Sequence, residues 1–249
     1  MSALILALIA GAVVGLALGA LGGGGSVLAV PALIYLLGFT PAAATTASLI
    51  IVTATSLAAL YAHARAGHVR WKAGAAFAAA GLLPAALAGA AAARLPQAVL
   101  TVAFAAIAAL AAVRMLRPAD PAGARSSTVR PGKAAGAGAG LGALTGLLGV
   151  GGGFLAVPAL VTVLAFEMQA AVGTSLLVIT ANSLASLATR SGAAASLNWA
   201  VIGPFVATAV LGAWDGKRLA SKVSGSRLQR IFAMVLLAVA TFMLIDALT

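Results

Sequence analysis

A glycine-rich pattern with a proline downstream occurs twice in the chain, and each copy interrupts a hydrophobic stretch. Glycines at 15, 19 and 22–25 precede the sequence LAVPAL at 28–33, and glycines at 142, 146, 149 and 151–153 precede the same six residues at 155–160. Leu28 and Leu155 are 127 residues apart, and we call this spacing the repeat offset. Helix-breaking residues are tolerated within a membrane where other groups satisfy the freed backbone. A duplicated pair of breaks is typical of repeat transporters whose binding site lies at the breaks.

The composition indicates a polytopic membrane protein. Of the 249 residues, 63% are hydrophobic and 8% are charged, whereas soluble domains average about 25% charged residues. So little polar surface cannot coat a soluble globule, and we expect the lipid bilayer to solvate the exterior. Residues 1–8 carry no basic residue, so the first hydrophobic run is expected to be a retained membrane helix and not a cleaved signal peptide.

The hydrophobic segments form two sets of five that match in order. The first set covers 3–21, 26–38, 42–63, 72–93 and 97–116, and the second covers 136–148, 153–166, 169–189, 199–215 and 228–248. We predict an all-α protein with two repeats, 1–116 and 136–249, in one integrated transmembrane domain joined by a cytoplasmic linker, 117–135. A spanning helix needs about 20 residues. The segments 26–38 and 153–166 therefore either cross or re-enter, and the chain has eight to ten transmembrane or half-membrane helices.

The positive charges predict that the second repeat is inverted. The net charge is +11, and 13 of the 15 Lys and Arg residues lie in 64–72, 114–133 and 217–230, while Arg94 and Arg190 lie in other short turns. Placing the three basic loops in the cytoplasm satisfies the positive-inside rule and puts both termini outside. Each half then crosses an odd number of times. A parallel repeat would instead leave one basic loop of each half outside.

The glycine runs predict an anion site. A helix start presents unpaired N–H groups and a partial positive charge, which suits an anion, and glycine lets a ligand approach the backbone closely. The predicted backbone donors are Gly24, Gly25 and Ser26 in the first copy and Gly151, Gly152 and Gly153 in the second. The alternative is that the glycines only permit tight helix packing, as we expect for those at 11, 15, 19, 138, 142 and 146.

The helix after each break adds polar side chains at matching positions. Ser48 and Thr55 share a face of 42–63, and the repeat offset relates them to Ser175 and Asn182. Hydroxyls and amides donate to an oxyanion without burying a full charge. The alternative is that the hydroxyls bond to their own helix or to a neighbouring helix. Two histidines, at 63 and 68, lie at the first basic loop as either proton carriers or ordinary solvated side chains.

The sequence lacks the residue patterns that indicate an enzyme, a metal site or a nucleic-acid-binding protein. The absence of cysteine excludes disulfides and thiolate sites, and the two histidines lie far in sequence from the four acidic residues, so we expect no metal, no cofactor and no enzyme. No basic run with interleaved aromatic residues indicates nucleic-acid binding.

The paired pattern resembles the TauE/SafE family of membrane proteins. The segment 146–158 is a close match, as is Val172-Gly173-Thr174-Ser175-Leu176, and the stretch from His68 to Trp71 resembles a basic and aromatic loop of that family. The first repeat departs from the pattern, because Ser26 replaces the last glycine and Thr46-Ala47-Ser48 replaces Gly-Thr-Ser. The resemblance covers essentially the whole chain and implies export of sulfite, sulfonates or related small sulfur oxyanions across the bacterial inner membrane.

We therefore expect a secondary transporter that moves a small oxyanion by alternating access at the repeat interface. The alternatives are an anion channel and a non-transporting membrane accessory protein. A homodimer is left open as a partner.

Overall fold

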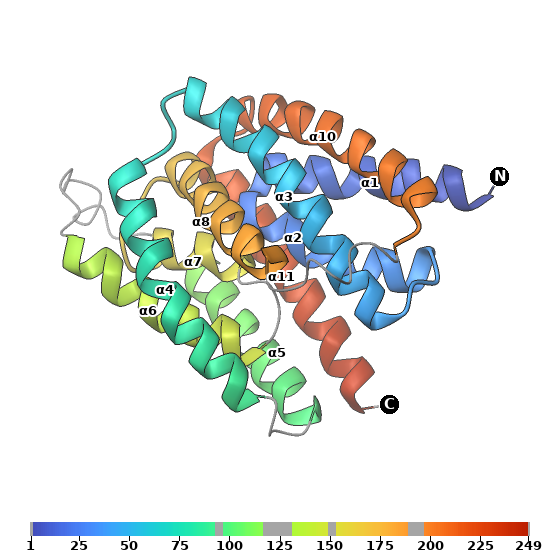
Figure 1. The fold of residues 1–249 in the computed structure, drawn as a ribbon. Coiled ribbons are helices and arrows are strands. Elements are labelled where there is room, and N and C mark those ends of the chain that lie inside the picture. The colour runs from blue at the N-terminus through green and yellow to red at the C-terminus, as the bar shows by residue number, and fades with distance from the viewer. Residues whose placement is uncertain (1, 93–96, 117–130, 149–152, 189–196, 249) are drawn as a thin grey trace.

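The computed structural model describes residues 2–92, 97–116, 131–148, 153–188 and 197–248, and within these ranges the regular elements are all helical (Figure 1). The first half contains α1 (Ser2–Leu21), the 3₁₀ turn η1 (Gly22–Gly25), α2 (Ser26–Pro31), the π-helical turn η2 (Ala32–Leu36), α3 (Pro41–Arg65), α4 (Trp71–Ala92) and α5 (Gln97–Leu116). The second half contains α6 (Pro131–Leu148), α7 (Gly153–Thr162), α8 (Met168–Ala188), α10 (Trp199–Ser221) and α11 (Gly225–Leu248).

The prediction of an all-α polytopic membrane protein is confirmed. Within the described part of the chain, six helices are long and apolar enough to cross a membrane, namely α1, α3, α4, α8, α10 and α11. The predicted segment 97–116 coincides with α5, and the other predicted segments match helices in order along the chain. The inverted orientation of the second half stays a prediction.

The two short elements owe their length to glycine and proline. Pro31 ends α2 and has no N–H to continue an α-helical ladder, and the chain winds on as the π turn η2. The stretch from Ser26 to Leu36 therefore covers about 16 Å at the helical rise, well short of a bilayer core of about 30 Å. In the second half, α7 has ten residues and carries Pro158 inside it.

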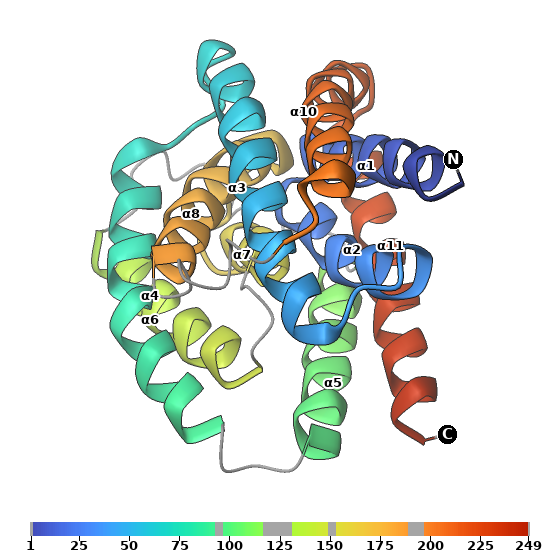
Figure 2. The ribbon, with the colours of Figure 1, turned by 45° about the vertical axis from the view of Figure 1, so that its right-hand side comes forward.

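The two most extensive helix contacts run along glycine faces. The first helix of each half lies against the fourth helix of the other half, so that α1 packs along α10 and α6 packs along α4, as Figures 1 and 2 show. A Cβ added to Gly15 would overlap the carbonyl oxygen of Ala209, and one added to Gly142 would overlap that of Gly81. The backbones therefore touch, which is the close approach that small residues allow in membranes.

The next most extensive contacts join equivalent helices. The third helix of the first half, α3, packs against its counterpart α8, and α5 packs against its counterpart α11. Together with the glycine-mediated pairs, these contacts interleave the helices of the two halves. The prediction that glycines at 11, 15, 138 and 142 serve packing fits this arrangement, since a Cβ at any of these positions would overlap a neighbouring helix.

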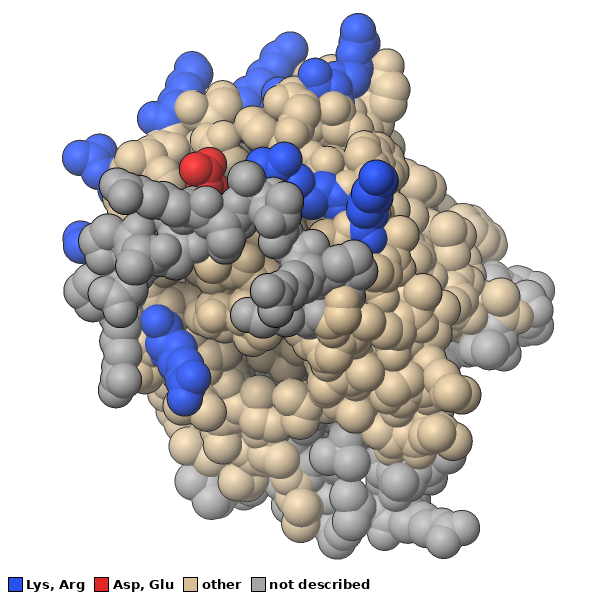
Figure 3. All heavy atoms as spheres, turned by 90° about the vertical axis from the view of Figure 1, so that its left-hand side faces the viewer, with Lys and Arg blue, Asp and Glu red and all other residues tan. Residues whose placement is uncertain are grey.

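The described helix ends that flank the basic loops lie at one end of the bundle. Lys217, near the end of α10, lines a pocket with His63, near the end of α3, and Gln229 at the start of α11 donates a 2.6 Å hydrogen bond to the carbonyl oxygen of Met115 at the end of α5. The helix ends next to the three basic loops are thus neighbours. Figure 3 shows most of the Lys and Arg side chains in the upper part of the face it presents. We call this region the basic end.

Candidate functional site

Buried hydroxyl groups lie between α3 and α8. Thr180 donates to the hydroxyl of Ser56 at 2.9 Å or to the carbonyl oxygen of Leu176 at 2.7 Å, and Thr180 and Ser56 are both buried. Ser183 and Thr53 are also buried. The sequence-based prediction does not include Ser56 or Ser183, although the repeat offset separates the two serines and is a signal that identifies both.

The predicted hydroxyl donors are buried on these same two helices, but each bonds to its own helix. Ser48 donates to Thr45, Thr55 to Ile51 and Ser175 to Val172, in each case to a backbone carbonyl oxygen three or four residues earlier. This is the local bonding considered as the alternative. A hydroxyl has one proton, so these groups must rotate before they donate to a ligand. Their role in substrate binding stays a prediction.

Asn182 differs from these hydroxyls because one of its polar atoms has no hydrogen-bond partner. Its side chain is half-buried, and its Oδ1 atom is buried without a hydrogen-bond partner. An unpaired buried polar group costs about 1–3 kcal/mol. A water molecule or a ligand donor would remove this cost, and turning the amide over would present its NH₂ donors at the same place.

The first glycine run lies against the second half of the chain. The turn η1 contacts α7 and α8, and α2 contacts α7. Gly22 has φ +64°, a conformation that favours glycine, and a Cβ there would lie 2.6 Å from Oγ of Ser175. The predicted donors Gly24, Gly25 and Ser26 lie at the junction of η1 and α2, so part of their backbone bonding is helical.

The second glycine run is described only at its end. Gly151 and Gly152 lie outside the described residues, and Gly153 is the first residue of α7. The structure therefore brings η1 next to the short helix that follows the second glycine run. Whether the two runs form one anion site stays a prediction.

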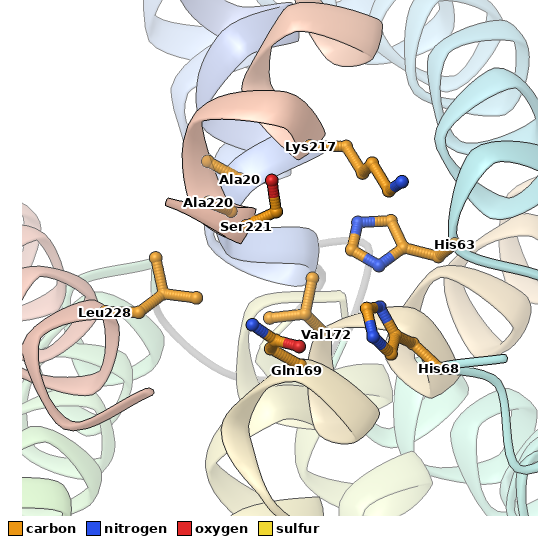
Figure 4. A pocket seen from close by; sticks show the side chains of 9 residues that line it. All are labelled: Ala20, His63, His68, Gln169, Val172, Lys217, Ala220, Ser221 and Leu228. Carbon is orange, nitrogen blue, oxygen red and sulfur yellow. The ribbon is translucent and has the colours of Figure 1, made fainter. Parts of the chain in front are cut away.

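A pocket at the basic end gathers a second set of polar groups (Figure 4). Its polar lining comes from His63 on α3, His68 in the loop before α4, Gln169 on α8, and Lys217 and Ser221 on α10. The apolar lining consists of Ala20, Val172, Ala220 and Leu228. The sequence indicates the two histidines as candidates but does not indicate Gln169, Lys217 or Ser221, since no spacing pattern links them. No group of three His, Cys, Asp or Glu side chains suited to a metal occurs among the described residues.

Comparison with known proteins places the chain in a family. The family model described as "Sulfite exporter TauE/SafE" matches residues 7–243. The chain belongs to the TauE/SafE family. A "Probable membrane transporter protein" from Xylella fastidiosa (strain Temecula1 / ATCC 700964) is 34% identical over 249 residues, covering 97% of this chain and 95% of the relative. A protein with the same name from strain 9a5c is 35% identical with the same coverage. No solved structure shows a significant match. This TauE/SafE member is thus a multi-pass membrane transporter.

Proposed function

We propose that this protein is a secondary transporter that exports a small sulfur oxyanion, sulfite or an organosulfonate, across the bacterial inner membrane by alternating access. The observation that carries the proposal is the exchange of helices between the halves, in which α1 packs along α10 and α6 along α4. This arrangement supports two halves related by a twofold rotation. In inverted-repeat transporters that axis lies in the membrane plane, and the site lies at the repeat interface.

We infer that the anion binds where η1, α7 and the paired helices α3 and α8 meet. Backbone N–H groups of the two glycine runs and the side chains of Ser48, Thr55, Ser175 and Asn182 are the proposed donors. Neutral donors offset the cost of dehydrating an anion without leaving a stranded charge in the membrane when the site is empty. The contact of η1 with α7 and α8 supports this location, and the unpartnered oxygen supports Asn182 as a polar contact on α8.

The glycine contacts suggest which parts move. Backbones that touch along a glycine face are close-packed, and close-packed contacts shift between discrete arrangements and do not deform continuously. We therefore infer that α1 with α10, and α4 with α6, move as units around α3 and α8. Each unit combines helices from both halves, so the moving parts differ from the two halves of the sequence.

Sulfite flux in proteoliposomes tests the proposal, with Asn182→Ala as the test variant and Asn198→Ala as the matched control. Asn198 is exposed before α10 and caps nothing with its side chain. We expect saturable wild-type flux that sulfite on the opposite side accelerates. Asn182→Ala should lower this flux at least about tenfold, equivalent to about 1.4 kcal/mol, without a lower melting temperature, while Asn198→Ala keeps wild-type flux.

Three results would overturn parts of this proposal. Flux that neither saturates nor exchanges identifies a channel. Absence of flux for sulfite and for organosulfonates removes the proposed substrate class. Wild-type flux in the Asn182→Ala variant removes the proposed site.

A further inference from the structure

The deepest polar group of the basic-end pocket is His63, and its hydrogen bonding defines what the pocket can accept. The side chain is 3% exposed, and its Nε2 atom lies 3.1 Å from the carbonyl oxygen of Gly19 on α1. A carbonyl oxygen only accepts, so Nε2 carries a proton and donates it. The other ring nitrogen, Nδ1, is buried without a hydrogen-bond partner.

Nδ1 of His63 therefore exists in one of two forms. In the neutral ring it is a bare acceptor, and its lone pair repels an oxyanion. With a second proton the ring is an imidazolium, and Nδ1 donates to an oxyanion. An anion that reaches this atom is thus held only if the ring also gains a proton.

The residues that face His63 from other elements include one cationic side chain and one titratable side chain, and the others are neutral. Lys217 comes from α10 and His68 from the loop before α4, and the two imidazole rings lie 5.8 Å apart at 53°. Nδ1 of His68 is likewise buried without a partner. Among the lining residues, α1, α8 and α11 contribute none that titrates. Burial lowers the pKa of His68, and the positive charge of Lys217 lowers it further.

We propose that this pocket binds one small oxyanion together with one proton, which His63 takes up on Nδ1 and donates in a hydrogen bond to the anion. The proton comes from solvent, and no bond of the anion breaks, so neutral imidazole, proton and anion combine into an imidazolium–oxyanion pair. Lys217 supplies a standing positive charge, and the side chains of His68, Gln169 and Ser221 supply further polar contacts. The choice of a sulfur oxyanion rests on the proposed function, whereas the pocket and its proton rest on these residues alone.

The size of the pocket requires its mouth to open. Its volume is about 10 Å³, which is room for roughly one water molecule. His63 is fixed in the floor, while His68, Gln169 and Lys217 are half-buried and Ser221 is exposed. Figure 4 shows Lys217 extending toward His63 and Gln169 lying on the side of His68. Entry of an anion therefore displaces the mouth side chains and leaves the floor in place.

Calorimetric titration of the purified protein with methanesulfonate tests the proton directly, because this anion carries no proton of its own near neutral pH. Titration in buffers that differ in protonation enthalpy gives the number of protons taken up per anion. We expect net proton uptake, up to one per anion, by the wild type. His63→Gln keeps an N–H donor for the Gly19 carbonyl oxygen but cannot titrate. It should bind at least tenfold more weakly and take up no proton.

A second pair of variants tests the pocket without touching the buried ring. Lys217→Met should weaken methanesulfonate binding several-fold and reduce its dependence on salt, since a charge next to the anion is lost. Lys222→Met is the matched control, because Lys222 is exposed just beyond α10 and does not line the pocket. If His63→Gln fails to fold, equal binding by the two lysine variants still overturns the proposal.

The results separate this inference from the proposed function. Binding without proton uptake in the wild type, or unchanged proton uptake in His63→Gln, overturns the inference even where sulfite flux is saturable. If His68→Gln loses proton uptake while His63→Gln retains it, the proton belongs to His68 and not to His63. This result also overturns the inference. Proton-linked binding with no flux of sulfite or organosulfonates upholds the pocket and overturns the proposed transport of sulfur oxyanions.

Discussion

The turn that follows the short helical element is built alike in both halves, although its central residue differs. In the first half Gly38 has φ +69°, and the N–H of Phe39 bonds to the carbonyl oxygen of Leu33 at 3.0 Å. In the second half Ala165 has φ +53°, and the N–H of Phe166 bonds to the carbonyl oxygen of Leu160 at 3.0 Å. The repeat offset relates all three positions of one turn to those of the other.

This comparison indicates that the fold sets the turn and the residue adapts to it. The next helix starts at equivalent positions in both halves, since Ala44 bonds to the carbonyl oxygen of Thr40 at 2.8 Å and Ala171 to that of Glu167 at 2.9 Å. A left-handed conformation costs a non-glycine residue roughly 1–2 kcal/mol. Ala165 adopts this conformation despite the cost. The position at which α8 must start therefore outweighs the conformational preference of alanine.

The glycine contact between α4 and α6 tests whether the halves pack alike, and it gives the largest expected change in the free energy of unfolding. A Cβ on Gly142 would overlap the backbone of Gly81, whereas a Cβ on Gly140 meets nothing within 4 Å. We expect Gly142→Ala to lower the free energy of unfolding by about 1–3 kcal/mol, as overpacked cores do. Gly140→Ala should leave it unchanged or raise it by up to about 1 kcal/mol, because alanine favours helix.

The measurement is denaturant or thermal unfolding in detergent micelles, with Gly15→Ala as the equivalent change in the first half. A loss at position 142 but not at 15 would show that only one half depends on its glycine face. Equal stability of the Gly142→Ala and Gly140→Ala proteins would contradict the close contact itself.

The helices could be predicted from the sequence because Gly, Pro and charge interrupt otherwise apolar runs. The segment 97–116 and the start of the short element at Ser26 agree with the structure. The contact of His63 with Gly19, far away in the sequence, and the place of Lys217 beside it could not be predicted. A glycine face indicates that a partner helix comes close, but it does not identify which one, and the pocket depends on that choice.

The alanine at the second turn gives an effect of intermediate size. Ala165→Gly should raise the free energy of unfolding by up to about 1 kcal/mol, because glycine adopts positive φ without a steric penalty. Gly38→Ala should lower it by about 1–2 kcal/mol, and open space around Gly38 leaves backbone conformation as the only cause. The melting temperatures of the two variants should move in opposite directions. Shifts of the same sign would refute the equivalence of the turns.

Substitutions at the starts of α3 and α8 should have the smallest effect on the free energy of unfolding. The two halves stabilise these helix starts in different ways. Thr40 caps α3 by accepting from the N–H of Ala43 at 3.4 Å, and this long, exposed bond places Thr40→Ala near the low end of cap effects, about 0.5 kcal/mol. The equivalent residue Glu167 is exposed before α8, where its negative charge stabilises the helix start by roughly 0.3–1 kcal/mol at low salt. Unfolding measured at low and high salt separates the two mechanisms, because ions screen the exposed charge and leave the hydroxyl bond unaffected. The loss in Glu167→Ala should therefore shrink with added salt while that in Thr40→Ala stays constant, and an equal salt response would mean that the two halves begin these helices by the same electrostatic means.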